Sequence, residues 1–300
     1  MRRARSLVAR WSPGTWTPGT WTLVAAVLVA GALAGCAGLG RSEPEPLDVL
    51  SFNIRYANPG DGADTWDLRT DLVFGVIRDH DPDVVGLQEA LPRQMDALRE
   101  AFPAYRFVGV GRDGDGRGEH AALMIREDRF EVVEHGDFWL SPTPDVVASR
   151  GWDAALTRIC SWAVLRERAG GAEFLVMNTH FDHQGAEARR ESAGVIVRRR
   201  ARHDELPVIV TGDLNAGEGS PPLAALTAGG LRDTFRDVHP DAREVGTFNG
   251  FRGTADGEKI DYVLVDDRWS TRDAAIVRDH EDGRYPSDHF PVSATVVLRR

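Results

Sequence analysis

Polar side chains of uncommon types stand at or beside the ends of β-rich runs throughout this chain. Six such segments are Ser51–Asn53, Leu87–Glu89, Asn178–Asp182, Thr211–Asn215, Lys259–Tyr262 and Ser287–His289. Packing alone gives little reason for carboxylates beside valine and leucine, because an unpaired buried carboxylate costs free energy. The pattern therefore predicts strands whose polar ends converge on one rim.

Short β-rich runs alternate with helical spacing from Leu47 to the end of the chain. Strands are expected at Leu47–Ile54, Asp83–Gln88, Ala121–Arg126, Phe130–Trp139, Arg158–Leu165, Glu173–Thr179, Val208–Thr211, Lys259–Val265 and Val292–Leu298. Helices are expected at Trp66–His80, Gln94–Phe102 and Ala186–His203. No Pro/Gly-rich linker divides this part, so residues 47–300 predict one domain, an α/β sandwich with mixed sheets.

Composition narrows the chemistry. The formal net charge of -10 argues against a protein that coats nucleic acid, which needs an electropositive face. Two cysteines can form at most one disulfide, which cannot stabilise a fold of 300 residues. Cys160 lies in an apolar context typical of a small core residue. Carboxylates, amides and a few histidines without paired cysteines favour a hard divalent ion, Mg²⁺ or Mn²⁺, over structural zinc.

The N-terminus has the order of an export signal. Four arginines and no acid precede the apolar run Leu23–Gly35, which is too short to span a bilayer comfortably. The sequence Leu-Ala-Gly-Cys ending at Cys36 resembles a bacterial lipobox. We therefore expect a signal peptide at 1–35, lipidation of Cys36 and a short tether at 36–46. The alternative is an ordinary secretory signal in which Cys36 has no role.

These features predict an exported protein, attached to the cell membrane by an N-terminal lipid and facing the extracytoplasmic side. No protein partner is indicated by the sequence.

Several of the polar segments resemble one family. The strings Gly212-Asp-Leu-Asn215 and Ser287-Asp-His289 follow Leu87-Gln-Glu89 and Asn53 in the order seen in the endonuclease/exonuclease/phosphatase superfamily of metal-dependent phosphohydrolases. The resemblance covers residues 47–300 and implies a four-layer α/β sandwich, two packed mixed β-sheets flanked by helices, with the site at one end. Arg55 replaces an acid found in some DNA-repair members, and the remainder looks more like the deadenylase-like and uncharacterised bacterial branch.

The resemblance also implies roles for individual residues. Asn53 and Glu89 would bind the activating metal, with Asp288 at or near the same ion. Asp213 would orient or deprotonate the attacking water, and Asn215 would donate to the phosphoryl oxygens. Whether one ion or two operate stays open.

Two histidines complete the expected site. His180 would orient the phosphate or assist the leaving group. His289 would contact the scissile phosphate, and Asp261 would hold its imidazole in one tautomer. His120, His183 and Arg158 are further candidates to line the cleft.

Each of these residues has a structural alternative. Asn53 and Asn215 could cap turns after strands, and Glu89 could stabilise the first turn of a helix. A lone histidine beside an apolar strand is usually structural.

The sequence thus predicts an exported Mg²⁺-dependent hydrolase of phosphoester bonds that uses a metal-activated water. Its substrate could be nucleic acid, a phospholipid headgroup or a small phosphoester. A catalytically inactive binding module on the same scaffold is the alternative function.

Overall fold

The computed structural model describes residues 45–299, which form two six-stranded sheets. The first has the order β11 (Trp269–Ile276), β12 (Val292–Leu298), β1 (Leu47–Asn53), β2 (Val84–Gln88), β4 (Leu123–Arg126) and β3 (Tyr105–Val108). The second has the order β5 (Phe130–Trp139), β6 (Ile159–Glu167), β7 (Glu173–His180), β8 (Val208–Asp213), β10 (Asp261–Val265) and β9 (Arg232–Asp233).

Each sheet has a parallel pair at its centre. β1 runs parallel to β2, and β7 runs parallel to β8, whereas the other pairings are antiparallel. Parallel neighbours need a crossover, and here helices supply it. The sheets are therefore mixed, as the sequence predicted.

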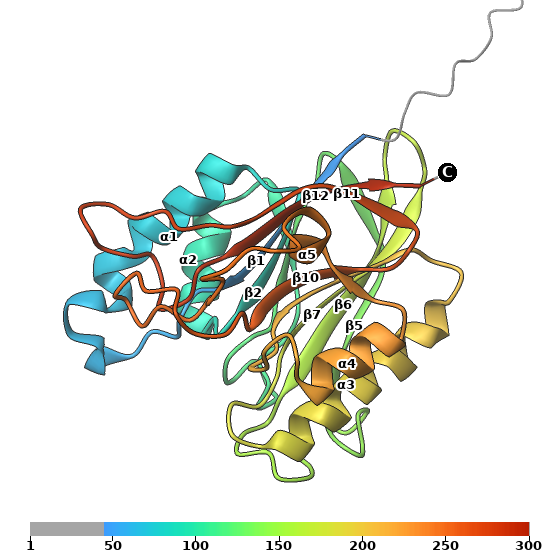
Figure 1. The fold of residues 1–300 in the computed structure, drawn as a ribbon, viewed down its shortest axis with the longest axis horizontal. Helices are drawn as coiled ribbons and strands as arrows, with labels where there is room; N and C mark the ends of the chain where they lie inside the picture. Colours follow the sequence, from blue (N-terminus) through green and yellow to red (C-terminus); the bar gives the residue numbers. More distant parts are fainter. Residues whose placement is uncertain (1–44, 300) are drawn as a thin grey trace, which may run out of the picture. The chain divides into compact units, whose positions relative to one another are not determined.

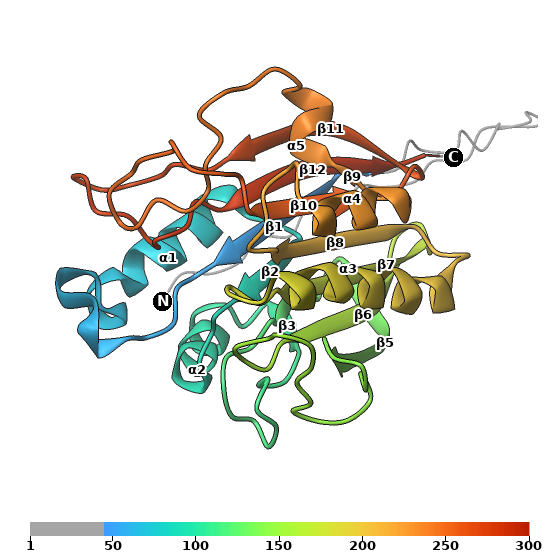
Figure 2. The same ribbon diagram turned by 60° about the horizontal axis from the view of Figure 1, so that its bottom comes forward.

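Helices cover the outer faces of both sheets (Figures 1 and 2). α1 (Trp66–His80) and α2 (Pro92–Ala101) share an apolar cluster with β1 and β2, and α3 (Ala186–Arg200) and α4 (Pro221–Ala228) share one with β7 and β8. The short α5 (Thr234–Val238) and the 3₁₀ turns η1 (Pro59–Asp64) and η2 (Ala201–His203) complete the elements. This arrangement confirms the four-layer sandwich.

The two sheets pack through alternate residues of their central strands. Val49 and Val84 of the first sheet belong to the same buried cluster as Val176 and Ile209 of the second. At Gly86, a Cβ atom would lie 2.1 Å from Oγ1 of Thr211, so only glycine permits this close approach. The contact fixes the spacing of the sheets beneath the rim.

Five strands and α-helices were not predicted from the sequence: β3, β9, β11, α4 and α5. β3 and β9 are short edge strands, and β11 carries a bulge between Thr271 and Asp273 that breaks its alternation. α4 presents a nearly all-apolar sequence without helical periodicity. Each therefore lacked the pattern on which the prediction relied.

The predicted signal peptide, Cys36 and most of the tether lie outside the described residues. No helix in the part that is described is both long and apolar enough to cross a membrane. Cys160 is a buried free thiol whose pKa is raised well above its ordinary value by burial, consistent with the expected core residue.

Candidate active site

Strand register brings most of the predicted site residues to one rim. Asn53 is the last paired residue of β1, and Glu89 directly follows β2. In the other sheet, His180 of β7 lies beside Asp213 of β8, and Asp261 of β10 is the partner of Asp213 on the other side. The alternation of strands and polar ends in the sequence therefore reflects a shared rim.

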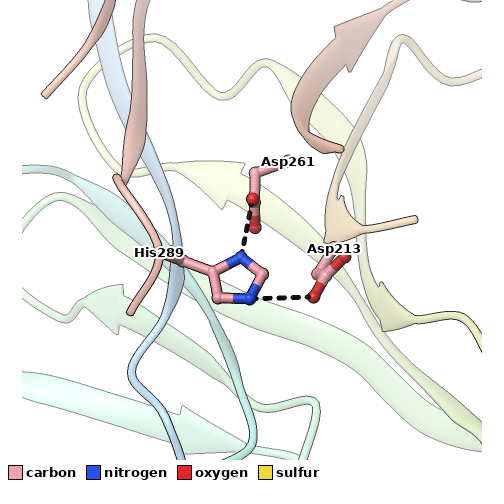
Figure 3. A group of neighbouring side chains, drawn as sticks. All are labelled: Asp213, Asp261 and His289. Carbon is pink, nitrogen blue, oxygen red and sulfur yellow. Dashed lines mark hydrogen bonds and ion pairs between the residues drawn. The ribbon is translucent and has the colours of Figure 1, made fainter. Parts of the chain in front are cut away.

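His289 lies between two buried carboxylates (Figure 3). Its Nδ1 is 2.9 Å from Oδ2 of Asp261, and its Nε2 is 3.8 Å from Oδ2 of Asp213. With Nδ1–H donating to Asp261, the other ring nitrogen is directed toward Asp213. The structure therefore joins three residues that are far apart in the sequence.

Asn53 connects this group to Glu89. Its Nδ2 donates to Oδ2 of Asp213 at 2.9 Å and to Oε1 of Glu89 at 3.2 Å. Asn53 also accepts the backbone N–H of Arg55, so it holds the turn after β1 as well as facing the site. Asp288 joins the same set, with Oδ2 3.7 Å from Nε of Arg55.

These donors fit a hard divalent cation. Glu89, Asp213 and Asp288 supply carboxylate oxygens to one cleft, and the possible ligand atoms of Asp213, Asp261 and His289 all lie within 4.8 Å of one another. One oxygen of Asp261, Oδ1, is buried without a hydrogen-bond partner among residues 45–299. Oxygen-rich sites with concentrated negative charge suit Mg²⁺ or Mn²⁺.

Asn215 and His180 lie on the other side of Asp213. Oδ1 of Asp213 accepts the backbone N–H of Asn215 at 2.9 Å, and His180 Nε2 is 3.4 Å from Oδ2. Nδ2 of Asn215 is 3.0 Å from His180 Nε2 and donates to the carbonyl of Phe181. The side chain of Asn215 thus serves the site rather than capping its own turn.

Burial and neighbouring charges separate the protonation of these groups. Burial, followed by repulsion from Asp261, raises the pKa of Asp213 to about 7. Burial opposes a charged His289, but Asp261 and Asp213 raise its pKa well above the ordinary value. Burial, followed by Arg158 and Arg112, lowers the pKa of His180 well below the ordinary value. At neutral pH the site therefore holds a cationic His289 and a neutral His180.

A cleft of about 680 Å³ opens at this rim. It is lined by predicted site residues together with residues from surrounding loops: Arg55, Tyr56, Glu89, Arg112, Glu119, Leu156, Arg158, His180, His183, Asp213, Asn215, Phe248, Gly257, Glu258, Ile260, Asp288 and His289. Its volume is that of a small-molecule pocket.

Three residues of the rim have left-handed backbones. The φ angles are 55° at Arg55, 64° at Glu89 and 46° at Asn215. Residues other than glycine adopt such φ angles at a cost of about 1–3 kcal/mol, and they often do so at functional sites. These turns aim side chains at the cleft directly after β1, β2 and β8.

Asn178, which the sequence also placed at the rim, is structural. Its Nδ2 donates to the carbonyls of Leu87 and Ala122 at 2.8 and 2.9 Å, and its Oδ1 accepts from Gln88 and Thr211. The amide therefore ties the two sheets together below the cleft.

The remaining candidates divide between scaffold and cleft. Asp182 holds the turn before α3 by accepting the N–H groups of Gln184 and Gly185. His120 is buried, with Nδ1 3.0 Å from the carbonyl of Ala90. Arg158 and His183 line the cleft, as the sequence suggested they could.

Sequence reasoning did not identify Arg112, Glu119 or Phe248 as lining residues. Arg112 and Glu119 stand in the loop after β3, where four glycines between 111 and 118 hide any periodic pattern. Phe248 forms an isolated β-bridge with His289, and its ring lies edge-on to the imidazole at 5.3 Å between centroids.

Comparison with known proteins agrees with this geometry. A model of the Endonuclease/Exonuclease/phosphatase family matches residues 50–289. The structure of an endonuclease/exonuclease/phosphatase family protein from Bacteroides thetaiotaomicron is 37% identical, covers 86% of this chain and all of its own, and has a TM-score of 0.81. A mannosyl-6-phosphatase from the same species is 38% identical, covers 84% of this chain and all of its own, and has a TM-score of 0.78.

A curated relative lies further away. Tyrosyl-DNA phosphodiesterase 2 of Danio rerio is 24% identical over 285 residues, which span 86% of this chain and 69% of that protein. The family match extends over most of the chain and includes every site residue from Asn53 to His289. This chain therefore belongs to the endonuclease/exonuclease/phosphatase family.

Proposed function

We propose that this protein is an exported hydrolase of phosphoester bonds that depends on Mg²⁺, or Mn²⁺ in its place. The observation that carries the proposal is the convergence of Asn53, Glu89, Asp213 and His289 on one cleft. Family membership supports phosphoester hydrolysis as the reaction type.

Asn53, Glu89 and Asp288 would hold the ion. When bound, it would polarise the phosphoryl group and offset its negative charge. Asn53 is the last residue of β1, Glu89 directly follows β2, and Asp288 lies in the segment before β12. The carboxylate of Glu89 is oriented by a hydrogen bond from the backbone N–H of Tyr56 to Oε2, at 3.0 Å.

Asp213 would accept a proton from the attacking water. A pKa of about 7 matches a general base that works at neutral pH. The N–H of Asn215 and Nδ2 of Asn53 fix both of its oxygens, at 2.9 Å each, so the carboxylate is held before substrate arrives.

His289, kept cationic by Asp261, would donate Nε2–H to the scissile phosphate as negative charge develops. Asn215 would donate its amide N–H to a phosphoryl oxygen. His180 is neutral and lies within hydrogen-bond reach of Asn215, so it would orient that amide and the phosphate.

A small phosphoester is the substrate class we favour. The mannosyl-6-phosphatase similar to this chain is 38% identical, compared with 24% for the tyrosyl-DNA phosphodiesterase 2 of Danio rerio. The net charge of -10 also weakens long-range attraction to nucleic acid. Nucleic acid and phospholipid headgroups are the other two substrate classes, and both are included in the test below.

The reaction type is tested with bis-p-nitrophenyl phosphate and p-nitrophenyl phosphate, each with Mg²⁺, with Mn²⁺ and with EDTA. Hydrolysis that needs the metal supports the proposal. Absent turnover across these esters and across DNA, RNA, phosphoinositides and sugar phosphates would favour the inactive binding module instead.

We further propose that Cys36 carries a lipid and holds the domain at the extracytoplasmic face of the membrane. The support is the order of basic, apolar and small residues before Cys36 in the sequence. In cells, Cys36→Ser should move the protein from the membrane fraction to the soluble fraction. Continued sedimentation of this variant with membranes contradicts lipid anchoring.

A further inference from the structure

Arg158 is a buried cation in the wall of the cleft. It precedes β6, is 4% exposed, and lies beside His183, whose Nδ1 is 3.1 Å from its Nη2. Two other nitrogens, Nε and Nη1, have no hydrogen-bond partner within residues 45–299. A guanidinium carries five N–H donors, so Arg158 enters the cleft wall with much of its bonding capacity unused.

The nearest carboxylate does not need Arg158. Oδ2 of Asp182 is 3.6 Å from Nε, beyond a good hydrogen bond. Asp182 instead accepts backbone N–H groups of Gln184, Gly185 and Leu156 at 3.0, 2.7 and 3.1 Å. Burial acts to raise the pKa of Asp182, but these bonds outweigh it and lower the pKa to about 2. Its charge is therefore stabilised by the backbone.

The other arginine of this wall is already paired. Nη1 and Nη2 of Arg112 bind the two oxygens of Glu119 at 2.7 and 2.8 Å. Burial and then the charge of Arg112 lower the pKa of Arg158, so the folded protein keeps this second cation at a cost. Removing a charge from water is expensive unless a partner arrives, and a phosphate offers arginine two oxygens in matching geometry.

The site described above engages only part of a phosphate group. In the proposed function, the metal, His289 and Asn215 would contact two terminal oxygens, which monoesters and diesters both possess. A phosphomonoester dianion has a third terminal oxygen and a second negative charge. Arg158 is placed to take them, since it lines the same cleft and its charge acts on His180, which contacts Asn215.

We propose that Arg158 binds the terminal phosphoryl oxygen that a phosphomonoester has and a phosphodiester lacks, which makes this cleft a phosphomonoesterase site. The inference rests on the proposed function and specifies its substrate class. In this site Glu119 pairs with Arg112, and His183 contacts Nη2 of Arg158, while Nε and Nη1 of Arg158 are enclosed in the cleft wall.

The test compares monoester and diester hydrolysis in variants of the full chain. Arg158→Gln should lower kcat/KM for p-nitrophenyl phosphate by about 100-fold, as expected for loss of a buried charge-assisted bond, and change that for bis-p-nitrophenyl phosphate by less than about 5-fold. Arg158→Lys keeps the positive charge but loses the planar guanidinium that can bind two oxygens. It should lower kcat/KM for the monoester by an intermediate factor and leave kcat/KM for the diester unchanged. Arg117→Gln, whose side chain is 74% exposed, is the matched control and should behave as wild type.

Equal losses on both esters, or no loss on either, would overturn the assignment. A wild-type preference for the diester would do so as well. Circular dichroism and Tm report whether Arg158→Gln folds. If it does not, the ratio of kcat/KM for the monoester to kcat/KM for the diester in Arg158→Lys, compared with that of the wild type, decides.

Binding of inorganic phosphate in the presence of Mg²⁺, measured by calorimetry, separates this inference from the proposed function. If the wild type hydrolyses neither ester, the proposed function fails. Phosphate affinity that is weaker in Arg158→Gln than in Arg117→Gln still supports the anion site, and equal affinity overturns it.

Discussion

The cleft has two parts that are built differently. The acidic part comprises the lining residues Glu89, Asp213 and Asp288 with Asn53 and Asp261 behind them, all at or near the ends of strands of both sheets. The basic part comprises Arg112, Arg158 and His183, which come from loops before or after strands. The acidic part is fixed by strand register, whereas the basic part depends on loop conformation.

This difference separates reaction type from substrate choice. Strand ends hold side chains rigidly, which suits groups that bind a metal and activate water. Loops vary more easily and commonly carry specificity. We therefore expect changes in the acidic part to reduce hydrolysis of every ester, and changes in the basic part to alter the preference between esters.

The largest effect is expected for Asp213→Asn. The amide cannot accept a proton from water, so kcat should fall by about 100-fold or more on monoesters and diesters alike. Asparagine keeps one acceptor oxygen for the two N–H donors, from Asn53 and Asn215, that hold Asp213, so Tm should fall by only a few degrees. Steady-state kinetics with both nitrophenyl esters measures the effect, and near-normal turnover would remove Asp213 from the mechanism.

Asp261→Asn should have a smaller and pH-dependent effect. An amide can still accept from Nδ1–H of His289, but the negative charge that raises the pKa of His289 is lost. If protonated His289 assists the reaction, the alkaline limit of activity should move to lower pH, with a loss of about 10-fold at neutral pH. The kcat-pH profile is the measurement, and a uniform loss at every pH would indicate a purely structural role.

The two parts also differ in how far the sequence predicted them. Asn53 and Asp213 were identifiable because these residue types stand at strand ends, where register leaves few possible positions, and His289 through the Ser287-Asp-His289 string. The family resemblance assigned a catalytic role to Asn215, which faces the cleft, and none to Asn178, which ties the sheets, whereas residue type alone does not separate them. That distinction depends on the direction in which each side chain projects from its sheet.

The basic part was less accessible to sequence reasoning for a physical reason. Arg158 was a candidate only through its neighbours, and Arg112 was one of 36 basic residues in a chain with a single lysine. Whether an arginine is exposed or buried, and whether a carboxylate already neutralises it, depends on tertiary contacts such as the Arg112–Glu119 pair. The same holds for β11, an edge strand whose bulge conceals its pattern.

Metal removal should expose a pH-dependent loss of stability in the acidic part. Folding raises the pKa of Asp213 from 3.8 to about 7, chiefly through burial and then through Asp261. A carboxyl group that holds its proton more tightly when folded lowers the free energy of unfolding as pH rises through this interval. In EDTA, Tm should therefore fall between pH 5 and pH 8, by about 2–4 °C for each kcal/mol lost in a domain of this size.

Two controls sharpen this prediction. Saturating Mg²⁺ should remove most of the decline, because the cation neutralises the carboxylates. Asp213→Asn in EDTA should flatten it, since the titrating group is gone. A decline that is the same in the wild type and in Asp213→Asn would place its origin outside the site.

The smallest effect is expected at the mouth of the cleft, for Phe248→Ala. Phe248 is 49% exposed, and its ring packs edge-on against His289. An exposed aromatic face beside a phosphate site can cover the leaving group of the substrate, so its loss should raise KM by about 3-fold and leave kcat nearly unchanged, as expected for uniform binding. Leu156→Ala, at another exposed apolar lining residue, is the matched comparison. A fall in kcat without a change in KM would mean instead that Phe248 positions His289, and it would move this residue from the substrate-selecting part of the cleft to the reacting part.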